Sequence, residues 1–130
     1  MDINNKNKIS RSSEDYLKAI YFLQEINNEV RVTDLADKLN ISKPSVTRAV
    51  NNLKKRNLVE HENYGLLKLT PSGFVFAKNI VLRHIVLRKF LCDLLGVEKE
   101  IAEIEACKLE HSMSNGTINK LKKYLKEVGV

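Results

Sequence analysis

Three residues near the C-terminus carry side chains of the kind that bind transition metals. Cys107, Glu110 and His111 are spaced at i, i+3 and i+4, so on a helix they project from one face at adjacent turns. Thiolate, carboxylate and imidazole together can hold a divalent transition metal, and the set matches neither a closed structural zinc site nor the all-oxygen set of calcium. The spacing alone leaves a second interpretation open, a half-buried cysteine beside a surface Glu-His pair, because such triplets arise often by chance.

The same residues could form a thiol-imidazole catalytic pair. Cys107 and His111 lie one helical turn apart, which is close enough for an imidazole to activate a thiol. The sequence shows no oxyanion-hole loop, no third orienting group and no substrate cleft to complete such a site. We therefore expect a protein that is not an enzyme.

A second cluster of chemically informative residues is basic. Residues 43–56 contain five cations and no acid, whereas residues 98–110 contain five glutamates against two lysines. The five cations are Lys43, Arg48, Lys54, Lys55 and Arg56. The basic segment is the candidate for binding DNA. A charge run by itself is more often a solvated helix face, so this interpretation depends on the elements around it.

A recognition helix enters the major groove by its N-terminal part, where side chains reach phosphates and base edges. The residues placed to do so are Ser42, Lys43, Pro44, Ser45, Thr47, Arg48 and Asn51. Arg48 is the best candidate for reading a base, because its forked donors suit guanine, and Asn51 could pair with adenine.

The elements around this segment predict a helix-turn-helix. Apolar spacing predicts a first helix from Ser12 or Ser13, as N-cap, to Asn27-Asn28. A strand-like stretch at 30–32 leads to a short helix capped by Thr33, and Ser42 caps a third helix that Pro44 can begin and that runs to about Arg56. Two helices joined by a short turn after a supporting helix form the helix-turn-helix motif.

The next segments predict a wing and then helices only. Apolar and polar residues roughly alternate in residues 58–61 and 66–69. The turn between them, at 62–65, contains Gly65, which supplies a permissive backbone, so these segments predict a hairpin. Thr70-Pro71 opens a long helix that Gly96 ends. A fifth helix is expected from Glu98 to about Met113. A sixth, capped by Ser114, should place Ile118, Leu121, Leu125 and Val128 on one side.

Composition excludes several classes of protein. The 130 residues are 43% hydrophobic and 29% charged, with a net charge of +6, so the chain can bury a core and is not globally disordered. Two cysteines are too few for a disulfide framework. No window approaches the ~20 apolar residues of a membrane span, and Met1–Ser10 is too polar for a signal peptide. We therefore expect a cytoplasmic protein with no membrane partner.

Four blocks of sequence together resemble the diphtheria-toxin-repressor and manganese-transport-regulator family. The blocks are residues 14–21 (EDYLKAIY), 41–47 (ISKPSVT), 69–73 (LTPSG) and 105–114 (EACKLEHSMS). The resemblance extends from about Ser12 to the C-terminus. It implies a dimeric winged-helix repressor that binds DNA when loaded with ferrous or manganous ion and so shuts down metal-uptake genes.

The resemblance also implies a principal metal site of Asp15, Cys107, Glu110 and His111. Asp15 stands where iron-responsive members have methionine and manganese-responsive members have aspartate. Cys107 stands where the iron type has cysteine and the manganese type has glutamate. The ligand set is therefore a hybrid, and the implied cofactor is Mn(II) or Fe(II).

A second family site is only partly present. His84 matches one of its ligands, and Glu103 could substitute for another. Lys18 stands where the manganese type has a glutamate, and Arg88 where the iron type has one. Since these cations would repel a second metal, we do not expect a fully occupied binuclear centre. Cys92 matches no ligand and is expected to be a core thiol.

These observations predict a mainly α protein with an N-terminal winged helix-turn-helix (1–73) and an all-helical metal-binding and dimerisation domain (74–130). The expected function is a metal-dependent transcriptional repressor of metal-ion uptake genes. Its expected partners are a second copy of the chain and a palindromic operator in double-stranded DNA. The alternative is a winged-helix regulator that is constitutive or answers to a small molecule, in which case chelators would not change DNA binding.

Overall fold

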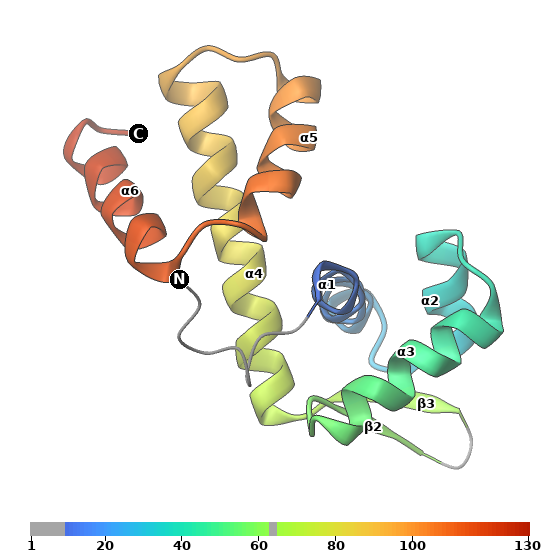
Figure 1. The fold of residues 1–130 in the computed structure, drawn as a ribbon. Coiled ribbons are helices and arrows are strands. Elements are labelled where there is room, and N and C mark those ends of the chain that lie inside the picture. Colours follow the sequence, from blue (N-terminus) through green and yellow to red (C-terminus); the bar gives the residue numbers. More distant parts are fainter. Residues whose placement is uncertain (1–9, 63–64) are drawn as a thin grey trace. The chain divides into compact units, whose positions relative to one another are not determined.

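The computed structural model describes residues 10–62 and 65–130, which form a mainly helical chain with one small sheet (Figure 1). The chain forms two compact units that divide between Lys78 and Asn79. The elements before the division are α1 (Arg11–Ile26), β1 (Val30–Arg31), α2 (Val32–Leu39), α3 (Lys43–Lys55), β2 (Val59–His61), β3 (Leu66–Leu69) and the start of α4 (Pro71–Lys89). The later elements are the rest of α4, a π-helical turn η1 (Phe90–Leu94), α5 (Lys99–Glu110) and α6 (Asn115–Glu127).

The helix that supports the helix-turn-helix, α1, begins two or three residues earlier than the sequence predicts. Ser10, rather than Ser12 or Ser13, is the N-cap of α1, and its Oγ accepts a hydrogen bond of 3.1 Å from the backbone N–H of Ser13. α2 also starts early, because the Asp34 carboxylate accepts a hydrogen bond of 2.8 Å from the N–H of Arg31. Thr33 therefore lies inside α2 rather than capping it.

α3 confirms its predicted start and its predicted buried face. Ser42 is the N-cap, its Oγ accepts from the N–H of Ser45 at 3.4 Å, and Pro44 lies in the first turn, where no N–H is needed. Val46, Val50 and Leu53 are fully buried in the core of the first unit. This stripe fixes which face of α3 is left for other contacts.

The predicted wing is present. β3 pairs antiparallel with β2, with Val59 opposite Leu69, and with β1, with Val30 opposite Leu67, so the strand order is β1-β3-β2. Gly65 has a φ of +80°, as expected for the turn, while the turn residues Asn63 and Tyr64 lie outside the described part of the chain. The side chain of Gln24 on α1 accepts a hydrogen bond of 2.8 Å from the N–H of Leu69, which ties the sheet to α1.

Thr70 joins the wing to α4. Its hydroxyl donates to the carbonyl of Asn57 at 2.8 Å and accepts from the N–H of Gly73 at 3.0 Å, so one side chain caps the helix and holds the turn after α3. Gly73 allows a close approach, because a Cβ there would lie 1.9 Å from the carbonyl oxygen of Leu58.

The second unit packs α5 and α6 against the later part of α4, which lies between them in Figure 1. Its core contains Leu87, Ala102, Ala106, Ile118 and Leu125. The unit departs from prediction in three places. The long helix widens into η1 before Gly96 (φ +73°) ends it. α5 stops at Glu110, short of Met113, because the chain turns toward the Ser114 cap of α6. Val128 is 45% exposed because it follows the last turn of α6.

No helix within the described residues is long and apolar enough to span a membrane.

Candidate metal centre and DNA interface

Cys107 and His111 come together at the C-terminal end of α5. A ring nitrogen of His111 and the Sγ of Cys107 lie within 4.8 Å of each other, close enough to bind one ion. His111 is the C-cap of α5, and both residues are half-buried. The Nε2 atom of His111 is buried. A soft thiolate and a borderline imidazole in a partly enclosed place suit a transition metal better than calcium or magnesium.

Glu110 is the most buried charged residue among those that the structure describes, with 1% of its surface exposed. A buried carboxylate is costly unless opposite charge or hydrogen bonds compensate it. Its Oε1 lies 2.9 Å from the Nδ1 of His84 on α4. The carboxylate is therefore held in the interior of the second unit, at the end of the helix that carries Cys107.

His84 faces a carboxylate with each ring nitrogen. Besides the contact with Glu110, its Nε2 lies 2.9 Å from the Oε2 of Glu103. The hydrogen bond with Glu110 is the largest cause that raises the pKa of His84; burial opposes it, and the hydrogen bond and charge of Glu103 add to the rise. The two carboxylates therefore favour the protonated form of the imidazole.

Glu103 is shared between His84 and Arg88. Its Oε1 accepts a hydrogen bond of 3.1 Å from the Nη1 of Arg88. Burial alone would raise the pKa of Glu103, but the hydrogen bonds and the charges of His84 and Arg88 together outweigh burial and lower the pKa. Glu110, His84, Glu103 and Arg88 form a row of alternating charge across α4 and α5, which we call the charge row.

Arg83 holds the end of α5 in place, a role that the sequence did not predict. Its Nε donates to the carbonyl of Glu110 at 2.8 Å, its Nη1 donates to the Asn115 side chain at 2.7 Å, and its Nη2 donates to the carbonyl of Met113. One guanidinium thus fixes the end of α5, the following turn and the start of α6. The partners lie 27 to 32 residues away in the chain, so no local pattern could have identified the residue.

The remaining expected ligand, Asp15, lies on α1 in the first unit and is half-buried. Its neighbours Tyr16 and Leu17 belong to the core of that unit. Asp15 is therefore carried by a helix that is built into the winged-helix core.

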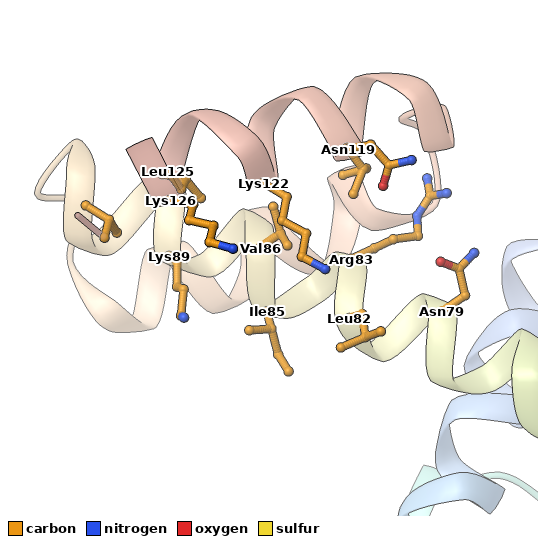
Figure 2. Close-up of a pocket in the computed structure, with 12 residues that line it drawn as sticks. Asn79, Leu82, Arg83, Ile85, Val86, Lys89, Asn119, Lys122, Leu125 and Lys126 are labelled. Atoms are coloured by element: carbon orange, nitrogen blue, oxygen red, sulfur yellow. The ribbon is translucent and has the colours of Figure 1, made fainter. Parts of the chain in front are cut away.

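A cavity of about 310 Å³ lies between α4 and α6 (Figure 2). Its apolar lining includes Val86, Ile118 and Leu125, and Lys122 and Lys126 of α6 face it together with Lys89 of α4. Among the described residues that line it there is no thiol, imidazole or carboxylate side chain. The candidate ligands of this unit, on α5 and α4, are not among the residues that line it.

The exposed face of α3 carries the residues expected to contact DNA. Lys43, Pro44, Arg48 and Asn51 are exposed on it. Ser45 and Thr47 are half-buried. Ser42 is exposed but already engaged, since its hydroxyl caps α3 and donates to the Oγ of Ser45 at 2.9 Å. With the apolar stripe turned inward and no acid on the helix, α3 presents a basic surface of the kind that approaches a phosphate backbone.

Comparison with known proteins assigns a family domain to each half of the chain. Residues 8–67 match the iron-dependent repressor N-terminal DNA-binding domain. Residues 70–130 match the iron-dependent repressor metal-binding and dimerisation domain.

Relatives that match most of the chain are HTH-type transcriptional regulators. An HTH-type transcriptional regulator of Methanocaldococcus jannaschii is 38% identical over 120 residues, which are 92% of this chain and 96% of the relative. The HTH-type transcriptional regulator MntR of Geobacillus thermodenitrificans is 36% identical over 110 residues, covering 85% of this chain and 77% of that protein.

Solved structures show the same fold. A manganese-dependent transcriptional repressor in complex with manganese superposes with a TM-score of 0.79 at 31% identity, over 88% of this chain and 52% of that one. The manganese regulator SloR gives 0.77 at 31% identity, over 88% and 53%. The chain thus spans about half the length of these solved proteins.

A winged helix-turn-helix joined to a metal-binding and dimerisation domain defines a metal-dependent, DNA-binding transcriptional regulator. The chain belongs to the iron-dependent repressor family, which confirms the resemblance drawn from its sequence. The relatives named above are transcriptional regulators and not enzymes, and none of them supports the alternative of a regulator without a metal switch.

Proposed function

We propose that this protein represses metal-ion uptake genes by binding a palindromic operator as a homodimer when it holds Mn(II) or Fe(II). The observation that carries the proposal is the end of α5, where the donor atoms of Cys107 and His111 lie within 4.8 Å of each other and the neighbouring residue, Glu110, is buried. Such a group of anionic and imidazole donors suits a divalent transition metal.

The proposed ligands are Asp15, Cys107, Glu110 and His111. The sequence resemblance also offers His84 and Glu103 for a second position, which is taken up below. Three of the four principal ligands come from one helix end that Arg83 fixes in place. Asp15 would come from α1. The ion, when bound, would offset the negative charges of the thiolate and the carboxylates.

The residues around Asp15 explain how such a link would act on DNA. α1 is not a detachable arm, because Leu17 and Ile20 are fully buried in the core that also holds Val46 and Val50 of α3. A constraint on Asp15 is thus transmitted to α3 through close packing. Fixing Asp15 to α5 in each protomer would set the two recognition helices at the spacing of an operator.

The ligand chemistry leaves two metals open. The Cys107 thiolate favours ferrous iron, and the Asp15 carboxylate admits manganese. The relatives of known metal named above respond to or contain manganese. Both cysteines are free, and a Cys107 ligand requires a reduced thiol, which supports placing the protein in the cytoplasm.

The test is DNA affinity with and without metal. Operator sequences would be selected from a random duplex pool, separately with Mn(II) and with chelator, so that neither state is favoured. Fluorescence anisotropy under anaerobic conditions should then show tighter binding with Mn(II) or Fe(II) in the wild type and in Cys92→Ala. Cys107→Ala should lose the response. Equal affinity with metal and with chelator in the wild type would refute the proposed switch.

A further inference from the structure

We propose that Arg88 permanently supplies the positive charge at the His84 and Glu103 position, so that each chain binds one metal ion rather than two. His84 and Glu103 then act as positioning residues for Glu110 and not as ligands of a second ion. The inference rests on the proposed metal-dependent function and specifies how many ions that function uses.

The first support is that the contacts of the charge row are already made. Each ring nitrogen of His84 lies 2.9 Å from a carboxylate oxygen, Nδ1 from Glu110 and Nε2 from Glu103. Both oxygens of Glu103 are likewise engaged, Oε2 by His84 and Oε1 by Arg88 at 3.1 Å. An ion bound by His84 and Glu103 would have to replace these contacts.

The second support is the kind of cation that holds Glu103. A guanidinium stays charged at every pH a protein experiences, so proton loss cannot vacate the position. A divalent ion on Glu103 would lie beside that fixed charge and be repelled by it. The cation is also part of the chain, since Arg88 on α4 bridges to Glu103 on α5.

The third support is the gradient of exposure along the charge row. The Glu110 side chain is fully buried and that of His84 is 18% exposed, whereas Glu103 and Arg88 are 42% and 41% exposed. Arg88 closes the solvent end of the row and holds Glu103, which orients His84, which holds the buried Glu110. The row thereby places one carboxylate of the proposed principal site.

The test counts ions on the full chain. Mn(II) titration followed by electron paramagnetic resonance should give one bound ion per wild-type chain. Co(II) titration should show a near-ultraviolet thiolate charge-transfer band that saturates at one equivalent, which assigns that ion to Cys107. Arg88→Glu, which exchanges the cation for a carboxylate, should bind two ions, and Lys89→Glu should bind one. Arg88→Gln, a milder change, should bind a second ion more weakly than Arg88→Glu does.

Each outcome decides between the two claims. Two ions on the wild-type chain would overturn this inference and leave the metal-dependent function standing, whereas no bound ion would overturn both. One ion on the wild type and still one on folded Arg88→Glu and Arg88→Gln would show that Arg88 does not set the number.

A second readout needs no metal. In chelator, Arg88→Ala should melt roughly 2 to 4 °C below the wild type, because the link between α4 and α5 is lost while its exposed position keeps the effect small. Lys89→Ala removes the same charge from an exposed neighbour and should melt with the wild type. An unchanged melting temperature in Arg88→Ala would contradict a constitutive link.

Discussion

Glu110 is the residue on which the proposed centre depends most, because its carboxylate is fully buried and faces His84. Glu110→Gln keeps the size and a hydrogen-bond acceptor for His84 but removes the charge. We predict at least about a 100-fold loss of Mn(II) affinity, since even residues that only support a ligand are worth about 10- to 100-fold. Isothermal titration calorimetry, with circular dichroism as the check on folding, measures it.

Glu105→Gln is the matched control. It makes the same change on the same helix at an exposed position, so its Mn(II) affinity should equal that of the wild type. A folded Glu110→Gln variant that bound Mn(II) as tightly as the wild type would show that the ion lies elsewhere.

Gly73 tests the junction between the wing and α4. In Gly73→Ala the new methyl group would meet the backbone carbonyl of Leu58 at 1.9 Å, and a backbone atom cannot rotate away. We predict that the free energy of unfolding falls by about 1–3 kcal/mol, as in other overpacked sites. Urea denaturation gives the value, with Gly116→Ala, which meets only the Ser114 hydroxyl at 3.9 Å, as the variant that should not be destabilised.

At the scale of elements, α3 separates a packing face from a binding face. Arg48→Ala removes an exposed side chain opposite the buried stripe. The fold should persist while operator affinity falls about 5- to 150-fold, and discrimination at one base pair should relax, as for loss of a base-reading arginine. Anisotropy titrations on the operator and on single-base variants measure both effects.

Lys120→Ala, an exposed cation on α6, controls for net charge and should keep wild-type specificity. If Arg48→Ala weakened binding equally on every duplex, Arg48 would be a phosphate contact and not a base reader.

The sequence located the elements well and their ends less well. The sequence predicts Ser42 and Ser114 as caps because each is a serine at a clear break in the apolar pattern, and in the structure each Oγ accepts from the N–H three residues later. Ser10, Ser12 and Ser13 are all plausible caps, and only backbone geometry selects Ser10. The π-helical turn η1 leaves no signature in the apolar spacing, so the helix was expected to continue to Leu95.

At the scale of the whole molecule, the sequence likewise predicts one part of the candidate centre and not the other. Cys107, Glu110 and His111 are neighbours in sequence, and their spacing predicts a shared helix face; the structure places the donors of Cys107 and His111 within 4.8 Å of each other. Glu110 is held by His84 and Arg83, which lie 26 and 27 positions before it in the chain. These contacts depend on how α4 packs against α5. The sequence predicts that Arg88 disfavours a second metal, but only the structure shows that Arg88 pairs with Glu103.

Metal removal should change the stability of the whole chain. A ligand that binds the folded state at 100 times its Kd stabilises it by about 2.7 kcal/mol. We therefore predict that Mn(II) raises the melting temperature of the wild type and that chelator reverses the rise. Glu110→Gln should melt at one temperature in both conditions. A wild-type melting temperature that ignored Mn(II) would contradict binding to the folded state.

The central claim is that one free energy couples the metal centre to the DNA-binding face. The most direct test is the Mn(II) affinity of the full chain with and without saturating operator, at fixed salt. Reciprocal linkage predicts that operator tightens Mn(II) by the same factor by which Mn(II) tightens operator, about 5- to 150-fold for couplings of typical size. An Mn(II) affinity that operator DNA leaves unchanged would contradict the claim.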